Sequence, residues 1–240
     1  MEFHEKLSSY LTDFGVNMIG FADLTVLPAS VRMNLPNGVV FGIALDPAAV
    51  ALVPQMASMQ YYQAYQGANK RLDEVSILAQ DFLTQNGYKA IAQSMDYVNR
   101  QREQIGPDQR SGRAFLPYKT VAALAGLGWI GKNALLITEQ YGSAIRFSSV
   151  LTDAPLPAQQ ADYHCLCNTC RICVDACPGQ AIKNTTWTPK TDRDELFDLE
   201  ACKKAIAQRG KPLNIQNGSC GVCIAVCPYT QKYLDAANLT

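Results

Sequence analysis

The chain has 240 residues, of which 48% are hydrophobic and 18% are charged, so it can bury a substantial core and lacks the composition of a disordered protein. Its 21 Lys and Arg residues balance its 21 Asp and Glu residues, which leaves no net field to draw it onto nucleic acid or an anionic membrane. The N-terminus is polar, and no segment has about 18 uninterrupted apolar residues. We therefore expect a soluble, cytoplasmic protein with no membrane contact.

Helical and strand patterns alternate along the first 160 residues. Phe3, Leu7 and Leu11 recur at helical spacing, whereas the run GVVFGIAL is typical of a buried strand. The pattern predicts an α/β layer domain. Its expected elements are a helix at 2–14, strands at 16–23 and 38–45, helix at 48–86 ending at Asn86-Gly87, and strands at 88–94 and 143–152.

All nine cysteines lie at or after Cys165. The Pro- and Ala-rich stretch 154–162 precedes them and is typical of a linker, so we place a domain boundary near residue 160. Disulfides are rare in the cytosol, and an odd number of cysteines leaves at least one thiol unpaired. The cysteines therefore indicate metal or redox chemistry.

The cysteines form two related motifs, CxxCxxCxxxCP and CxxCxxxCP, and a further cysteine, Cys202, lies between them. Two-residue gaps let one tight loop bring three thiolates to a 4Fe–4S cube, while the cysteine before proline reaches the other cube in two-cluster ferredoxins. Zinc is the alternative, but zinc sites usually show paired CxxC motifs without a third cysteine at the same spacing. The spacing therefore predicts two 4Fe–4S clusters, one held by Cys167, Cys170, Cys173 and Cys227 and the other by Cys177, Cys202, Cys220 and Cys223.

Cys165 has no place in this assignment. We interpret it as a spectator thiol beside the first ligand, with a substitute ligand one step out of register as the alternative.

A glycine-rich stretch, AGLGWIGKNALLI at 125–137, is the second informative feature. Gly126, Gly128 and Gly131 fit the dinucleotide fingerprint G-x-G-x-x-G, which should follow a strand and open a helix. Here the preceding YKTVAALA reads as a helix and the following NALLIT as a strand, so a dinucleotide site is not favoured. The structural alternative is a glycine-rich turn that packs Trp129 into the core.

Together, AGLGWIGKNALLIT, SSVLTDAPL and the cysteine motifs resemble the epoxyqueuosine reductase family, iron–sulfur enzymes related to the reductive dehalogenases. The resemblance covers residues 10–232. It implies an α+β protein in which a nitroreductase-like α/β domain at 1–160 binds a corrinoid and a bacterial-ferredoxin-like domain at 161–240 carries two 4Fe–4S clusters. It also implies a cofactor contact, corrinoid or alternatively flavin, at Gly126, Gly128, Trp129, Gly131 and Lys132.

Two features depart from the family pattern. The catalytic aspartate position of the tRNA-processing members falls on Gly112, and the nearest acid is Asp108. The helical-repeat extension of those members is absent, so tRNA binding is not favoured and a short branch of the family is the closer match. Tyr118 and Lys119 then become candidate proton donors, because a desolvated cofactor pocket can lower the pKa of a lysine.

We therefore expect an oxidoreductase that passes electrons through two clusters to a cofactor or substrate in the N-terminal domain. The expected partners are a ferredoxin- or flavodoxin-type donor and a small-molecule or modified-nucleoside substrate. The alternative is a non-catalytic electron-transfer protein of the same fold without a corrinoid.

Overall fold

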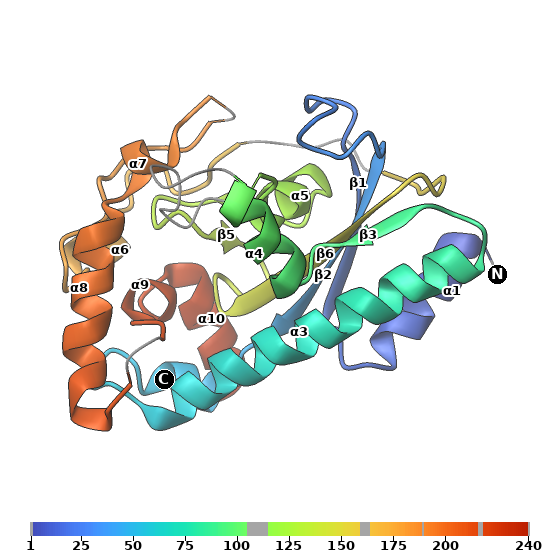
Figure 1. Cartoon of the computed structure of the whole chain (residues 1–240). Coiled ribbons are helices and arrows are strands. Elements are labelled where there is room, and N and C mark those ends of the chain that lie inside the picture. The colour runs from blue at the N-terminus through green and yellow to red at the C-terminus, as the bar shows by residue number, and fades with distance from the viewer. Residues whose placement is uncertain (1, 105–114, 159–163, 189, 216–217, 240) are drawn as a thin grey trace. The chain divides into compact units, whose positions relative to one another are not determined.

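The computed structural model describes residues 2–104, 115–158, 164–188, 190–215 and 218–239 (Figure 1). The chain forms two compact units. One comprises 1–43, 69–127 and 146–162, and the other comprises 44–68, 128–145 and 163–240. The segments 44–68 and 128–145 thus fold with the cysteine-rich part of the chain. The change of unit at 162–163 lies close to the expected boundary, and the division of functions between 1–160 and 161–240 stays a prediction.

A four-stranded sheet forms the centre of the first unit. Its strand order is β1 (Met18–Asp23), β2 (Asn37–Ala44), β6 (Ile145–Thr152) and β3 (Ala90–Ala92). β1 pairs with β2 in antiparallel register, with Gly20 opposite Val40, and β3 pairs antiparallel with β6. The four strands expected from the sequence therefore form.

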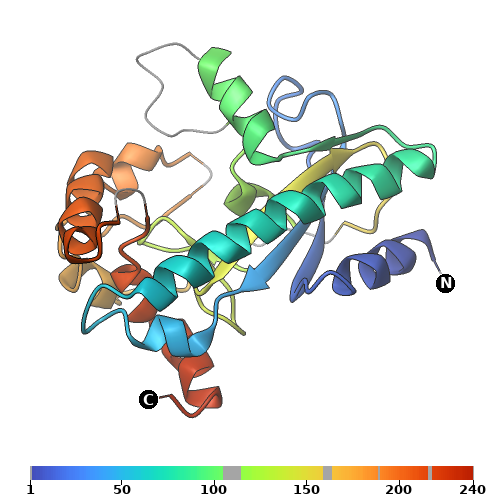
Figure 2. The ribbon, with the colours of Figure 1, turned by 60° about the horizontal axis from the view of Figure 1, so that its bottom comes forward.

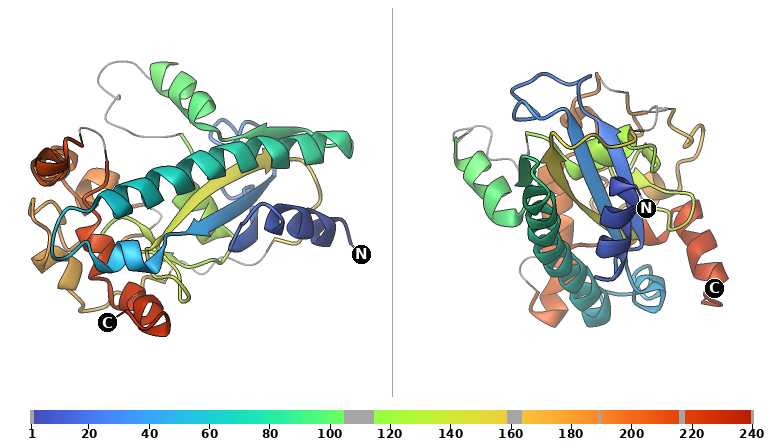
Figure 3. Two further views of the ribbon diagram at one scale, coloured as in Figure 1. Left: turned by 90° about the horizontal axis from the view of Figure 1, so that it is seen from below. Right: turned by 90° about the vertical axis from the view of Figure 1, so that its right-hand side faces the viewer.

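Two helices cover one face of this sheet. They are α1 (Phe3–Thr12) and the second half of α3 (Met59–Gln85), which runs along the sheet (Figures 2 and 3). Glu2 and Glu5 form a capping box that starts α1. Strand residues Val39 and Phe41 alternate along β2 and face the helices. The core consists of these two and Leu7, Leu11, Leu72, Val75, Ala79, Leu83 and Val150.

The opposite face of β1 and β2 packs against α5 (Tyr118–Leu124). A Cβ at Gly20 would lie 2.9 Å from Ala125 Cβ, and one at Gly38 would lie 3.0 Å from Val121 Cγ1. These glycines therefore permit the close approach of α5. The remaining helix of this unit is α4 (Met95–Gln104).

The second unit contains a small hairpin, β4 (Trp129–Ile130) with β5 (Leu136–Ile137), and several short helices. Ile182 and Phe197 form an isolated bridge. Among the described residues, no helix has the length and hydropathy needed to span a membrane. The helices are α2 (Pro47–Ala51), α6 (Ile172–Asp175), α7 (Arg193–Leu196), α8 (Leu199–Gly210), the 3-10 helix η2 (Lys211–Leu213), α9 (Val222–Ala225) and α10 (Pro228–Ala236).

Candidate metal centre

The first cysteine motif forms a tight loop that leads into α6. Asn168 adopts a left-handed backbone conformation with φ of 42°, and the N–H of Cys170 donates to the carbonyl of Cys167 at 2.8 Å. The motif ends at Cys177, whose Sγ accepts a hydrogen bond of 3.3 Å from the N–H of Ala181. The loop therefore brings its thiols to one side of a short helix.

The second motif repeats this arrangement around α9. Gly221 precedes the helix with φ of 74°, and a Cβ there would lie 2.5 Å from Tyr61 Cζ. Cys227 is the N-cap of α10, with Pro228 in the first turn. Proline suits this position because the first-turn N–H groups have no helical partner. Pro228, which follows Cys227, thus lies at the start of α10.

Four thiols from both motifs interact as one set, which we call the first cysteine set: Cys167, Cys170, Cys173 and Cys227. Burial raises the pKa of Cys173 to about 12, and the charges of Cys167, Cys227 and Cys170 contribute to that rise. Burial also raises the pKa of Cys227, with further contributions from Cys167 and Cys170. Cys227 therefore lies with the first motif although it belongs to the second.

The remaining four thiols, Cys177, Cys202, Cys220 and Cys223, form the second cysteine set. Burial raises the pKa of Cys202, and the charges of Cys177 and Cys220 raise it further. Desolvation raises the pKa of Cys223, and the charges of Cys220, Cys173, Cys202 and Cys177 all add to the effect. Cys177 from the first motif thus joins the second set, and Cys173 lies between the sets.

Each cysteine set offers four thiols, the number that a 4Fe–4S cluster requires. In the described part of the chain, no three His, Cys, Asp or Glu side chains converge as ligands of one metal ion. Four thiolates around one zinc would lie closely together, whereas the thiolates of a 4Fe–4S cube bind four different irons and are farther apart. All nine cysteines are free of disulfides. The preference for a 4Fe–4S cluster over zinc rests on the cysteine spacing in the sequence, CxxCxxCxxxCP and CxxCxxxCP.

Lys132 binds the first cysteine loop. Its side chain is 5% exposed, and Nζ donates to the carbonyl oxygens of Asn168 at 2.8 Å and Cys170 at 3.0 Å. The pKa of Cys167 is lowered by its hydrogen bond with Cys165, and further by the backbone N–H of Lys132, the Trp129 indole and the Lys132 charge. Lys132 thus both shapes the loop and favours a thiolate in it.

Cys165 belongs to neither set, but it contacts the first one. It is 7% exposed and packs with Trp129, Ile137 and Cys227. Its hydrogen bond with Cys167, followed by burial, raises its pKa. Cys165 therefore stays a protonated thiol that can donate to Cys167.

The glycine-rich stretch forms the start of the β4–β5 hairpin. Gly126 follows α5 with φ of 69°, in the manner of a helix C-terminal glycine. A Cβ at Gly128 would lie 2.0 Å from Ile137 O, and one at Gly131 would lie 2.3 Å from Ile137 Cδ1. The stretch therefore follows a helix and opens a hairpin, and the structural alternative of a turn that buries Trp129 accounts for its glycines. Its role as a cofactor contact stays a prediction.

The candidate proton donors open α5 in the first unit. The Tyr118 hydroxyl donates to the carbonyl of Gln93 at 2.7 Å, and Lys119 beside it is half-buried. Gln93 is itself buried and hydrogen-bonds Ser149 and the carbonyl of Leu116. The hydroxyl proton of Tyr118 is therefore engaged with the backbone. Positions Asp108 and Gly112 lie outside the described residues.

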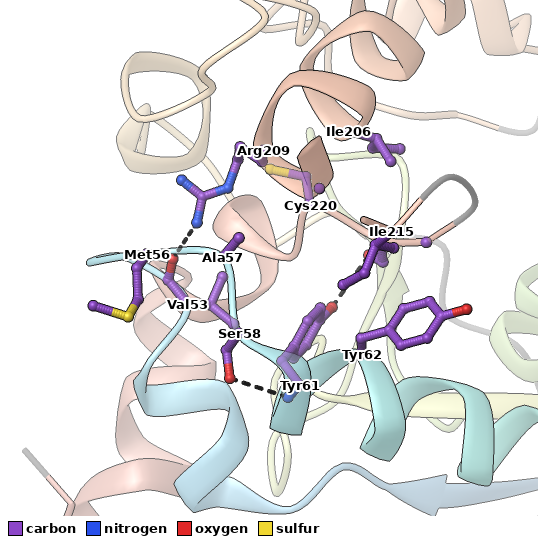
Figure 4. Close-up of a pocket in the computed structure, with 13 residues that line it drawn as sticks. Val53, Met56, Ala57, Ser58, Tyr61, Tyr62, Ile206, Arg209, Ile215 and Cys220 are labelled. Carbon is purple, nitrogen blue, oxygen red and sulfur yellow. Dashed lines mark hydrogen bonds between the residues drawn. The ribbon is translucent and has the colours of Figure 1, made fainter. Parts of the chain in front are cut away.

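Sequence reasoning missed Arg209, which lies near the second cysteine set. It shares the lining of a small pocket with Cys220, Tyr61 and Ser219 (Figure 4). Its only sequence signal is its place between Cys202 and Cys220 in the last turn of α8. An arginine there reads as an ordinary helix-terminal cation, so the sequence alone does not distinguish it.

Comparison with known proteins supports the cluster interpretation. Residues 166–230 match a family model described as a 4Fe-4S double cluster binding domain. An epoxyqueuosine reductase from Synechococcus sp. (strain RCC307) is 36% identical over 119 residues. Over this stretch the chain is similar to epoxyqueuosine reductases, and a tetrachloroethene reductive dehalogenase from Desulfitobacterium hafniense is 32% identical over 127 residues. The stretch aligned with the Synechococcus reductase makes up 50% of this chain and 36% of that reductase, so the chain spans well under two thirds of its length.

Solved structures of the family share the fold. An epoxyqueuosine reductase bound to an epoxyqueuosine-modified stem loop of tyrosine tRNA superposes with a TM-score of 0.58 at 18% identity, covering 95% of this chain and 65% of that one. A reductive dehalogenase described for B12-dependent dehalogenation superposes with a TM-score of 0.68 at 19% identity, covering 98% and 33%. The chain thus has a mixed α/β fold similar to that of both proteins, with a 4Fe–4S-binding domain.

Proposed function

We propose that the protein is an iron–sulfur oxidoreductase whose two cysteine sets each hold a 4Fe–4S cluster. The observation that carries the proposal is the exchange between motifs. Cys227 interacts electrostatically with the thiols of the first motif, while Cys177 acts on Cys202 and Cys223. This is the ligand exchange of two-cluster ferredoxins.

The residues around the thiols fit such clusters. Backbone N–H groups are directed at the sulfurs: Ala181 donates to Cys177, Val222 to Cys220, and Tyr229 and Thr230 to Cys227. Such donors stabilise the negative charge of cluster sulfurs and thiolates. When bound, the clusters supply one-electron carriers of low potential, and the surrounding chain sets that potential by burial and hydrogen bonding.

The reaction that we propose is a reductive one of the epoxyqueuosine-reductase type. The related reductase binds a modified tRNA stem loop and the related dehalogenase is described for B12-dependent chemistry. We extend these to a modified nucleoside or another small molecule as substrate and to a corrinoid as the cofactor. A ferredoxin- or flavodoxin-type protein is the proposed donor.

An electron-transfer protein without a corrinoid is the second candidate. It is favoured by the glycine-rich stretch, where Gly128 and Gly131 are required by contacts with Ile137. Trp129 is buried and Lys132 binds two carbonyls, so these residues already have structural roles. A corrinoid is therefore not needed to explain them.

Anaerobic purification with iron and sulfide counting tests the proposal. We expect about eight irons and eight sulfides per chain, because each 4Fe–4S cluster carries four of each. About four irons in a fully reconstituted sample would overturn the two-cluster assignment. Titration with cobalamin then separates the candidates: a spectral shift that saturates at one equivalent supports the reductase, and its absence supports the electron-transfer protein.

A further inference from the structure

Two buried N–H groups of the second unit lack hydrogen-bond partners. Among the residues that the structure describes, three buried side-chain polar atoms have none: Trp129 Nε1, Arg209 Nε and Asn184 Oδ1. Buried donors are nearly always satisfied in folded proteins, so each exception calls for an explanation. Trp129 and Arg209 share one feature, because each lies beside a thiol of a different cysteine set.

Trp129 lies beside the first cysteine set. Its side chain is 5% exposed and packs against Cys165, Cys167 and Cys227. The ring of Tyr229 meets the indole edge-on, with centroids 4.8 Å apart, and so fixes its orientation. The indole N–H favours the thiolate of Cys167, yet it makes no hydrogen bond of normal length. The indole N–H thus lies close to Cys167 and remains available to donate a hydrogen bond.

Arg209 lies beside the second cysteine set. Its Nη2 donates to the carbonyl of Val53 at 2.6 Å, which holds the guanidinium in place (Figure 4). Burial raises the pKa of Cys220, and the positive charge of Arg209 acts against that rise. Arg209 and Cys220 line the same pocket, and Arg209 Nε has no hydrogen-bond partner among the described residues. Nη2 is thus fixed by Val53, while the Nε–H is available to donate a hydrogen bond.

We propose that Trp129 Nε1–H and Arg209 Nε–H are hydrogen-bond donors to cluster sulfur, Trp129 at the cluster of the first cysteine set and Arg209 at the cluster of the second. The assignment rests on the proposed function, since it requires both clusters. Both residues act through the clusters, whose potentials they adjust.

Such donors have a predictable effect on reduction. Reduction adds negative charge to a cluster, and a hydrogen bond to its sulfurs stabilises that charge. Each donor therefore raises the midpoint potential of its own cluster. Arg209 also contributes a full positive charge, so the effect of its removal should exceed that of Trp129.

The first test is Trp129→Phe, which keeps an aromatic ring and removes the N–H. Redox titration monitored by EPR should show one of the two midpoint potentials shifted to a more negative value, with the other unchanged. Trp187→Phe is the matched control, because it also removes an indole N–H. Trp187 contacts Cys165 through its backbone, and the variant keeps that contact. Unchanged potentials in Trp129→Phe, with full iron content, would overturn the role of Trp129.

The second test compares Arg209→Gln with Arg209→Lys. Arg209→Gln should lower the potential that Trp129→Phe leaves unchanged, and Arg209→Lys should lower it less because the charge remains. Lys204→Gln removes an exposed cation from the same helix and should shift neither potential, since water screens it. A shift of the same potential by Trp129→Phe and Arg209→Gln would refute the assignment of one donor to each cluster.

A direct measurement on the wild-type clusters tests the proposal even if the Trp129 and Arg209 variants fail to assemble their clusters. With ¹⁵N-indole tryptophan, ENDOR of the reduced clusters should show a ¹⁵N coupling that persists in Trp187→Phe, which leaves Trp129 as the single tryptophan. With ¹⁵N-guanidinium arginine, a second coupling should appear on the other cluster. Absence of both couplings from a chain with about eight irons would reject these donors while leaving the two-cluster function intact.

Discussion

The buried ammonium group of Lys132 donates a hydrogen bond of 2.8 Å to the backbone carbonyl of Asn168. Asn168 lies between Cys167 and Cys170 in the first cysteine loop, and its backbone is left-handed with φ of 42°. Lys132 follows β4, so this contact joins the hairpin to the loop that carries Cys167 and Cys170. A residue of the glycine-rich stretch thereby shapes the metal site.

Replacing Lys132 with Met should weaken the first cysteine loop. The change removes two hydrogen bonds from a charged donor and leaves two carbonyls without a partner, a loss of about 3 kcal/mol. We expect a lower melting temperature and faster release of about half of the iron to a chelator. Lys183→Met is the matched control, because Lys183 Nζ also donates to a carbonyl, that of Asp194 at 2.8 Å, but is exposed. Equal iron release from both variants would contradict the role of Lys132.

Gly128→Ala should disrupt the β4–β5 hairpin. The new Cβ would lie 2.0 Å from Ile137 O, at a residue with φ of 155°. A backbone clash of this kind should lower the free energy of unfolding by about 4 kcal/mol or more. Gly67→Ala in α3 meets no atom within 4 Å and should instead stabilise the chain by about 0.5–1 kcal/mol. Thermal unfolding of both variants checks the opposite signs; a tolerated Gly128→Ala would refute the steric argument.

Local patterns in the sequence predicted much of the fold. Strands β1, β2 and β6 form where short runs rich in apolar residues predicted strands, and α3 ends just before Asn86-Gly87 as expected. The membership of 44–68 and 128–145 in the cysteine-rich unit was not predictable, because it depends on contacts far apart in sequence. Periodicity reports which face of an element is buried, but not against which partner.

In the candidate site, too, local sequence patterns predicted some features, while others depend on contacts between distant residues. The spacing predicts which thiols share a cluster, since the ligand pattern follows from the geometry of a cube, and this assignment stays a prediction. Lys132 and Trp129 were read as cofactor contacts because the resemblance placed them there, and their contacts with Asn168 and Cys167 depend on the folded hairpin. The sequence around Arg209 does not indicate that its Nε–H is buried and without a hydrogen-bond partner.

Tyr118→Phe separates a structural role from a catalytic one. The hydroxyl donates to Gln93 O at 2.7 Å, so its removal leaves a carbonyl in a buried polar cluster and should cost about 1–2 kcal/mol. Tyr97→Phe is a comparable change, since that hydroxyl accepts a hydrogen bond of 2.8 Å from Gln101. We expect similar losses of stability and little change in turnover from both. A fall in turnover of about 100-fold, with an altered pH profile, in Tyr118→Phe alone would instead support a proton-donor role.

Paired cysteine substitutions test which thiols share a cluster. If Cys227 belongs with Cys167, the double variant Cys167→Ala/Cys227→Ala should lose no more iron than Cys227→Ala and retain about four irons, because one cluster is lost in either case. Cys220→Ala/Cys227→Ala should lose both clusters, although these two cysteines belong to the same motif. Iron and sulfide counts after anaerobic reconstitution decide the outcome. The reverse result, with iron retained in Cys220→Ala/Cys227→Ala and lost in Cys167→Ala/Cys227→Ala, would show that each motif holds its own cluster and that the electrostatic grouping of the thiols does not reflect ligation.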